Sequence, residues 1–315
     1  MELSPAEAAV SRAGKISKYP GTFAAIGFFD GVHRGHRYLI EQLKQYALSE
    51  KLPAAVITFP QHPRKVLQQD YQPKLLNTFD ERMQQLTSTG VDYCYLIEFS
   101  KAFSETSAKD FIQEILYKQL NVKGLLIGYD HRFGKNCSES FEQYVEYGKA
   151  CGMKVFPAAE TDEHISSTTI RQLLSEGKVD IVAQKLSCFY CLEGEVVHGN
   201  HLGRTIGFPT ANLRLNDPNK MIPLEGVYAA RVSIGENHYG GMAYIGTRPT
   251  VVAQGEQRIE VNIFNFDCDI YGEILRLELI AFTRPDIHFQ GLEALTAQLT
   301  ADRSICRGKL FFDSF

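Results

Sequence analysis

The stretch "TFAAIGFFDGVHRGHRYLIEQLKQYAL", residues 22–48, joins a strand pattern to a helix pattern. Thr22–Ile26 is an apolar run typical of a buried strand, and residues 37–48 carry apolar side chains at helical spacing. Between them, residues 27–36 contain three glycines, two histidines, an arginine and an aspartate. A strand that passes through glycines into a helix exposes unpaired N–H groups and the positive end of the helix dipole. This arrangement is typical of a phosphate-binding site.

The composition indicates a soluble globular protein. The chain has 315 residues, enough for two domains, and is 44% hydrophobic and 22% charged. A net charge of -4 without a long basic run argues against broad binding of nucleic acids. We expect no membrane span and no secretory signal, because no apolar stretch reaches about 18 residues and the first residues lack the signal pattern.

The seven cysteines are scattered and odd in number, which favours a reducing cytoplasm over a disulfide scaffold. Cys188 and Cys191 form a lone CxxC. Two small residues entering a strand explain this pair better than a redox or zinc site does, since no second pair follows.

Strand and helix patterns alternate from residue 22 to about residue 185. Strand-like runs at 54–59, 93–99, 124–128 and 153–156 are separated by helical runs. Two of these helices begin with the polar pairs Thr78/Glu81 and Ser107/Asp110, which have capping spacing. The alternation predicts a parallel sheet covered by helices on both faces, with ligands bound at the carboxyl ends of the strands.

After residue 187 the pattern becomes mainly β. Strand-like runs occupy 191–197, 226–234, 238–246, 258–266 and 273–282, with a hairpin turn near 235–237. A single helical pattern, residues 292–310, follows. These features predict an antiparallel barrel or sandwich with a terminal helix, and a domain boundary between residues 186 and 187.

His33 and His36 are three residues apart and could donate hydrogen bonds to one phosphate. Gly31 and Gly35 would let the backbone approach it. A metal pair or two structural histidines are the alternatives. The segment "GYDHRFGKN", residues 128–136, follows another strand and adds Asp130, His131, Arg132 and Lys135, although it is not a Walker loop.

"ISSTTIR", residues 165–171, begins a further helix. Its hydroxyl residues Ser166, Ser167 and Thr168 could cap that helix or bind another phosphate. Arg171 has forked donors that match phosphate oxygens. A plain cap with a surface arginine is the alternative.

A second glycine-rich segment, residues 194–213, lies in the β-rich half. Gly199, Gly203 and Gly207 recur every four residues, with Arg204 among them, as in a loop that folds over a triphosphate. Thr210 and Asn212 offer oxygen ligands suited to Mg²⁺. A glycine-rich corner of a barrel is the alternative.

Glu260 alternates with the apolar Ile259, Val261 and Ile263 on a predicted strand. If those three face the core, Glu260 and Asn262 face the other way. A carboxylate there could accept the proton of an attacking hydroxyl in phosphoryl transfer. A solvated glutamate on the strand face is the alternative.

The first half resembles the nucleotidyltransferase superfamily. Within it, the resemblance is to the adenylyltransferase module of the bacterial bifunctional riboflavin kinase/FMN adenylyltransferase family, carried by the ordered segments "GFFDGVHRGH", "TFPQHPRKVL", "GYDHRFGKN" and "ISSTTIR". The second half, with "GNHLGRTIGFPTAN", "GVYAARV" and "IGTRPTV", resembles that family's riboflavin kinase domain. The resemblance implies a Rossmann-like nucleotidyltransferase domain over residues 1–186. It implies a six-stranded kinase barrel with a terminal helix over residues 187–315.

The resemblance also implies two reactions: ATP phosphorylates riboflavin to FMN, and a second ATP adenylylates FMN to FAD with release of pyrophosphate. It implies that Thr210 and Asn212 hold Mg²⁺–ATP and that Glu260 is the base. His33, His36 and Arg171 are the expected catalytic residues of the second reaction. The expected nucleotide-binding residues are Gly27, Phe28, Asp30, Gly31, Gly35, Ser166, Ser167, Thr168, Gly199, Gly203, Arg204 and Gly207. The expected flavin-binding residues are His62, Pro63, Arg64, Asp130 and Phe133.

Three positions depart from the family pattern. Tyr244 stands where the family usually has Asn, residues 283–289 replace a more charged run, and Asn136–Cys137 replaces Asn–Arg. The expected partners are small molecules, with no nucleic acid and no membrane, and the oligomeric state is not predicted. An adenylyltransferase with another acceptor, a class I tRNA synthetase and a non-catalytic flavin-binding module are the alternative functions.

Overall fold

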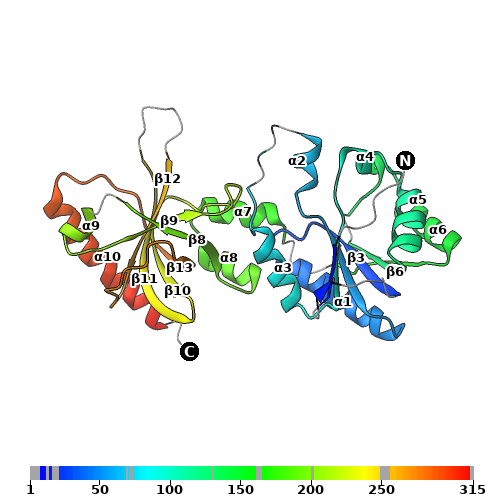
Figure 1. Cartoon of the computed structure of the whole chain (residues 1–315), viewed down its shortest axis with the longest axis horizontal. Coiled ribbons are helices and arrows are strands. Elements are labelled where there is room, and N and C mark those ends of the chain that lie inside the picture. Colours follow the sequence, from blue (N-terminus) through cyan, green and yellow to red (C-terminus); the bar gives the residue numbers. More distant parts are fainter. Residues whose placement is uncertain are drawn as a thin grey trace. The chain divides into compact units, whose positions relative to one another are not determined.

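The structure is a computed structural model that describes residues 8–11, 14–15, 21–68, 70, 72, 74–128, 131–160, 165–199, 202–248 and 256–312. Contacts divide the chain into two compact units, Met1–Ser166 and Ser167–Phe315. Each unit is described by itself (Figure 1).

The first unit is built on a sheet that contains seven strands within the described residues, in the order β2-β1-β5-β4-β3-β6-β7. Five consecutive strands of this order, β5-β4-β3-β6-β7, are parallel, which confirms the prediction. The antiparallel β1 and β2 extend the β5 edge and were not predicted, because they are too short to show a strand pattern. The strands are β1 (Ala8–Ser11), β2 (Gly14–Lys15), β3 (Thr22–Ile26), β4 (Ala54–Thr58), β5 (Tyr93–Leu96), β6 (Val122–Ile127) and β7 (Lys154–Pro157).

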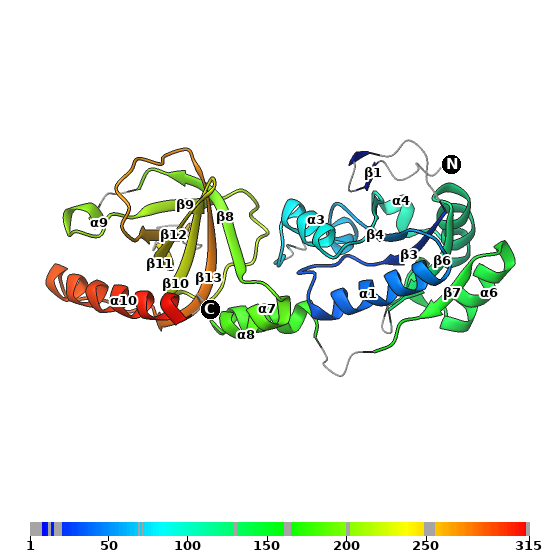
Figure 2. The ribbon, with the colours of Figure 1, turned by 90° about the horizontal axis from the view of Figure 1, so that it is seen from below.

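Helices cover both faces of this sheet, as Figure 2 shows. Successive β3 residues point to opposite faces: Phe23 and Ala25 join one core cluster with α1, and Ala24 and Ile26 join the other with η1 and α6. The segment predicted as a helix after Ser107 winds mostly as a π-helix, and its apolar stripe is buried. The helices are α1 (Arg34–Ser49), α2 (Pro63–Leu67), α3 (Phe79–Ser88), α4 (Lys101–Ser104), α5 (Ala108–Asp110), η1 (Phe111–Gln119), η2 (Lys135–Cys137) and α6 (Phe141–Cys151).

The strand order places a topological switch point beside β3. The chain leaves β3 toward β4 and β5, then returns to add β6 on the other side of β3. The loops after β3 and β6 therefore diverge at the carboxyl ends of the strands, where ligands bind in open α/β sheets. Residues 27–36 and 128–136 are these two loops.

The second unit is a closed antiparallel barrel with the strand order β10-β11-β12-β9-β8-β13, which confirms the expected six strands. Periodicity alone did not reveal β9, since it is short and its pattern is weak. The strands are β8 (Tyr190–Val197), β9 (Ala211–Leu215), β10 (Gly226–Ile234), β11 (Asn237–Arg248), β12 (Glu256–Ile263) and β13 (Ile274–Pro285). The helices of this unit are α7 (Ser167–Ser175), α8 (Val179–Leu186), α9 (Leu202–Thr205) and α10 (Leu292–Phe312).

The pair α7–α8 belongs to the second unit by its contacts. Leu224 donates a backbone hydrogen bond to Leu174 (2.9 Å), and Gly177, at φ +74°, lies against Leu224 and Phe282. The contacts divide the chain between residues 166 and 167, whereas the sequence motifs predict a boundary between residues 186 and 187. The boundary at 186/187 stays a prediction.

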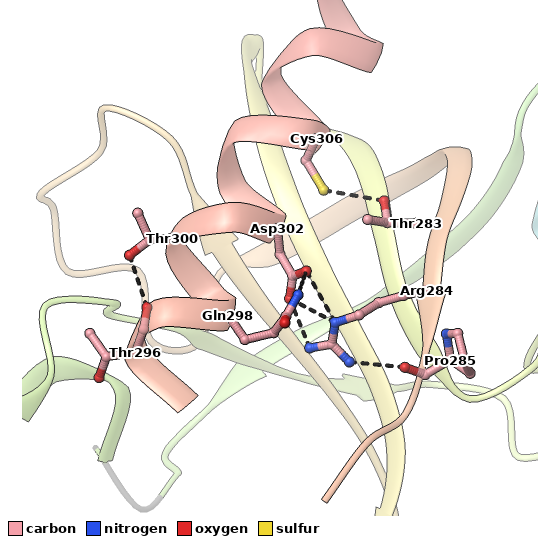
Figure 3. Close-up of polar contacts among 8 residues, drawn as sticks. All are labelled: Thr283, Arg284, Pro285, Thr296, Gln298, Thr300, Asp302 and Cys306. Atoms are coloured by element: carbon pink, nitrogen blue, oxygen red, sulfur yellow. Dashed lines mark hydrogen bonds and ion pairs between the residues drawn. The ribbon is translucent and has the colours of Figure 1, made fainter. Parts of the chain in front are cut away.

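Helix α10 is fastened to the barrel by a buried ion pair (Figure 3). The Arg284 guanidinium at the end of β13 donates to both carboxylate oxygens of Asp302 at 2.8–3.1 Å, and Gln298 donates to the same carboxylate at 2.8 Å. Asp302 is 0% exposed, so its charge depends on these partners.

We expect Arg284→Met to lower the free energy of unfolding of the second unit by about 3–5 kcal/mol, because it leaves a buried carboxylate without its cation. Faster hydrogen exchange in the α10 peptide would report the loss. The matched control is Arg214→Met, which breaks the exposed pair with Glu195 and should cost less than about 1 kcal/mol. Equal effects of the two substitutions would contradict the assignment.

Candidate active sites

His33 has a structural task at the start of α1. Its Nδ1 accepts a hydrogen bond from the backbone N–H of His36 (3.3 Å), which makes His33 the N-cap of the helix. A neutral ring that accepts at Nδ1 carries its proton on Nε2. The ring is 5% exposed. His33 therefore has the structural role that the sequence offered as an alternative, and its role as a phosphate ligand stays a prediction.

His36 stacks on His33, with ring centroids 3.7 Å apart and planes 16° apart, and its edge meets Phe29. Burial, with the nearby His33 and His131, lowers the pKa of His36 well below its usual 6.5. His36 is therefore neutral at pH 7. Its Nδ1 is buried and has no hydrogen-bond partner within the described part of the chain, as expected for an atom awaiting a ligand.

The glycines of this turn allow close approach. Gly31 adopts φ +85°, a conformation that favours glycine. A Cβ on Gly35 would lie 3.2 Å from Nδ1 of His33 and 3.5 Å from the carbonyl oxygen of Ile165. Ile165 itself therefore lies beside the histidine turn. The influence of His131 on His36 brings the loop after β6 to the same place.

Asp30 and Arg82 bind the backbone of loops at the carboxyl ends of the strands. Asp30 is buried and accepts from the backbone N–H groups of Leu76 (2.9 Å) and Asn77 (3.3 Å). This structural role accounts for Asp30, which the sequence suggested as a nucleotide ligand.

Arg82 was not selected from the sequence, because an arginine on an amphipathic helix looks like a surface residue. Only 2% of it is exposed. Its guanidinium donates to the carbonyl oxygens of Phe28 (2.8 Å), Phe59 (2.6 Å) and Pro60 (3.3 Å), and it lies 4.0 Å from the centroid of the Phe28 ring. The sequence pattern does not show that this arginine is buried, and burial is what marks it as important.

The flavin candidates are placed differently from one another. His62 caps α2 and meets the Phe28 ring edge-on at 4.6 Å, and Pro63 and the exposed Arg64 follow it in the first turn. Phe133 is a core residue stacked on Tyr144 at 4.3 Å, so core packing accounts for it. Asp130 lies outside the described residues.

Ser167, Thr168 and Arg171 lie in the first turns of α7, and Ile170 and Leu174 form its buried side. Ser166 is exposed and ends the first unit. Helix α7 groups with the second unit by its contacts, and the binding of a phosphate by these residues stays a prediction.

In the second unit, Glu260 faces a cavity of about 500 Å³. Ile259, Val261 and Ile263 are buried, as the alternation predicts, and Asn262 is buried with them. Glu260 is 18% exposed, and one carboxylate oxygen contacts Nε of Arg258. The other lies 3.4 Å from the Thr210 hydroxyl.

Asn212 is paired with Glu260 across β9 and β12. A Cβ on Gly199 would collide with the Asn212 amide, so Gly199 makes room for this side chain. Gly203 likewise lies against the carbonyl of Phe208 and close to Thr210. Gly207 has φ +79°, and Arg204 is exposed on α9.

The side-chain oxygens of Thr210 and Asn212, beside the Glu260 carboxylate, fit a magnesium ion that keeps water and phosphate ligands. They come together although no group of three His, Cys, Asp or Glu in the described ranges is arranged to hold a metal. That result also leaves His33 and His36 without a third protein ligand there.

Two family models match successive parts of the chain. The family described as FAD synthetase matches residues 15–169, and the family described as riboflavin kinase matches residues 186–310. Bifunctional riboflavin kinase/FMN adenylyltransferases are similar along most of the chain. The relative from Listeria monocytogenes is 38% identical over 90% of both chains, and that from Escherichia coli K12 is 36% identical over 91% of this chain and 92% of its own.

A crystal structure from Streptococcus pneumoniae, described as a macrolide-efflux protein, has a TM-score of 0.83 and 34% identity, covering 92% of this chain and 95% of its own. Among the described residues, no helix is long and apolar enough to span a membrane. The chain belongs to the bifunctional riboflavin kinase/FMN adenylyltransferase family.

The lowered pKa of His36 predicts a pH-dependent stability. Below pH 6.5 the unfolded chain takes up the proton before the folded protein does, so the folded state loses stability as the pH falls from 6.5 toward the folded pKa. Urea unfolding at pH 7.5 and 5.5 should show a smaller loss for His36→Asn than for the parent. An equal loss in both proteins would contradict a buried neutral His36.

Proposed function

We propose that the barrel cavity of this family member phosphorylates riboflavin and that the carboxyl edge of its parallel sheet adenylylates the resulting FMN. The observation that carries the first assignment is the cluster of Glu260, Thr210 and Asn212 in one cavity. The second assignment rests on the stacked histidine pair at the switch point of the sheet, in which His36 has a lowered pKa.

In the barrel, the riboflavin 5′-hydroxyl attacks the γ-phosphorus of ATP and ADP leaves. Arg258 holds one oxygen of Glu260, and the other oxygen accepts the proton of the attacking hydroxyl. Thr210 and Asn212 would hold Mg²⁺, which neutralises phosphate charge when bound. Gly199 and Gly203 leave space for their side chains.

In the first unit, a phosphate oxygen of FMN attacks the α-phosphorus of a second ATP, and pyrophosphate leaves. The nucleophile is already an anion, so the reaction needs positioning and charge stabilisation rather than a base. His33 and His36 supply neutral N–H donors at the N-terminus of α1. Ser166, Thr168 and Arg171 are proposed to contact the same triphosphate.

A cytoplasmic location is part of the proposal. None of the seven cysteines, Cys188 and Cys191 included, forms a disulfide bond, which suits a reducing compartment.

Glu260→Gln should lower the formation of FMN from riboflavin by about 10²–10⁴-fold, because the amide cannot take the proton. The same protein should still convert supplied FMN into FAD. Products separated by chromatography measure both reactions. A fully active Glu260→Gln kinase would rule out Glu260 as the base.

His36→Ala should have the reverse effect. Loss of a preorganised donor should slow FAD formation from FMN by about 10²–10³-fold while FMN formation from riboflavin continues. If both reactions fall equally in a folded protein, the assignment of one reaction to each unit is wrong.

A further inference from the structure

Tyr244 and Asp286 both line the barrel cavity. Tyr244 on β11 is paired with Glu260 on β12, and directly opposite side chains in an antiparallel pair share one face. Asp286 belongs to the divergent segment 283–289 and lines the same cavity as Tyr244 and Glu260. Tyr244 and Asp286 therefore lie in the same cavity as the proposed base.

These two residues are joined by a hydrogen bond in which the Tyr244 hydroxyl donates to the Asp286 carboxylate. Burial, with the charges of Asp286, Glu225 and Glu260, raises the pKa of Tyr244 to about 12. The hydroxyl therefore remains protonated, and remains a donor, at any pH near neutrality.

The direction of the tyrosine ring is fixed by its own strand. Gly246 lies two residues further along the same face, and a Cβ placed there would overlap the Tyr244 ring and hydroxyl. The hydroxyl end of the Tyr244 ring therefore lies beside Gly246.

Residues 286–289 form one wall of the cavity, and Arg284 and Tyr244 contact this wall. Arg284 is bound to Asp302 on α10, and its guanidinium also lies 5.7 Å from the centroid of the Phe289 ring (Figure 3 shows the Arg284–Asp302 pair). Asp286, Ile287, His288 and Phe289 all line the cavity. Asp286 is itself exposed, so Tyr244 is the contact that draws this wall toward β11.

We propose that Tyr244 and Asp286 are a substrate-positioning pair of the kinase site: their hydrogen bond holds residues 286–289 as the wall against which the flavin ring packs. The inference rests on the proposed function, since it takes riboflavin as the ligand of this cavity. The wall offers Phe289 and Ile287 to an aromatic ring system, while Glu260 stays available for the ribityl hydroxyl.

Tyr244→Phe tests the pair, because it removes the hydroxyl and keeps the ring. We expect the KM for riboflavin to rise about tenfold, while the KM for ATP and kcat change by less than about twofold. Formation of FAD from supplied FMN in the same protein checks that the chain is folded. Tyr239→Phe, on the same strand but against Phe266, is the matched control and should leave every constant unchanged.

Asp286→Ala and the double variant complete the cycle. If the two side chains act through one hydrogen bond, the double variant should raise the KM for riboflavin no more than either single variant does. Additive effects, or an unchanged KM in Tyr244→Phe, would overturn the proposal.

Binding of riboflavin to the Glu260→Gln protein, followed by quenching of flavin fluorescence, separates this inference from the proposed function. Weaker binding after Tyr244→Phe in that background supports the pair even if Glu260 proves not to be the base. Absence of riboflavin binding to the Glu260→Gln and parent proteins alike contradicts both proposals. Equal binding with and without the Tyr244 hydroxyl contradicts the pair alone.

Discussion

The first unit depends on a buried charge that has carbonyl oxygens as its immediate partners. The Arg82 guanidinium donates to the backbone after β3, at Phe28, and after β4, at Phe59 and Pro60. Burial lowers its pKa to about 10, which still leaves it charged near neutrality, and the field of Asp30 opposes the shift. Because carbonyl groups in adjacent loops share one cation, neither loop can move without leaving part of that charge unsolvated.

The barrel uses charges in a related way but pairs them with carboxylates. Arg284 and Asp302 fasten α10 to β13, and Arg258 holds one oxygen of Glu260. In both units an arginine fixes the backbone or side chain next to the reacting groups, while most of the groups proposed to contact substrate are polar and uncharged, with Glu260 and Arg171 as charged members. Rigid support and a mostly neutral donor set together give a preorganised site.

The sequence predicted the β3–β7 sheet and most of the barrel, because periodicity depends on which face each residue buries. It did not predict β9, whose pattern is weak, or the role of Arg82, whose partners are backbone atoms remote in sequence. Phe133 was expected at the flavin and lies in the core, since an aromatic residue after a strand suits both places. His33 was expected as a phosphate ligand, and its capping bond became visible only once α1 had a defined first turn.

The contact between Tyr244 and Gly246 has a consequence for the evolution of this site. A tyrosine at 244 is compatible with glycine at 246 and excludes any residue with a Cβ there unless the ring moves. A shorter side chain at 244, in contrast, would place no such restriction on the residue at 246. Lineages that carry the tyrosine should therefore have lost the freedom to vary at 246. Glycine at 246 therefore leaves room for tyrosine at 244 in the position observed, whereas any larger residue at 246 requires the tyrosine ring to move.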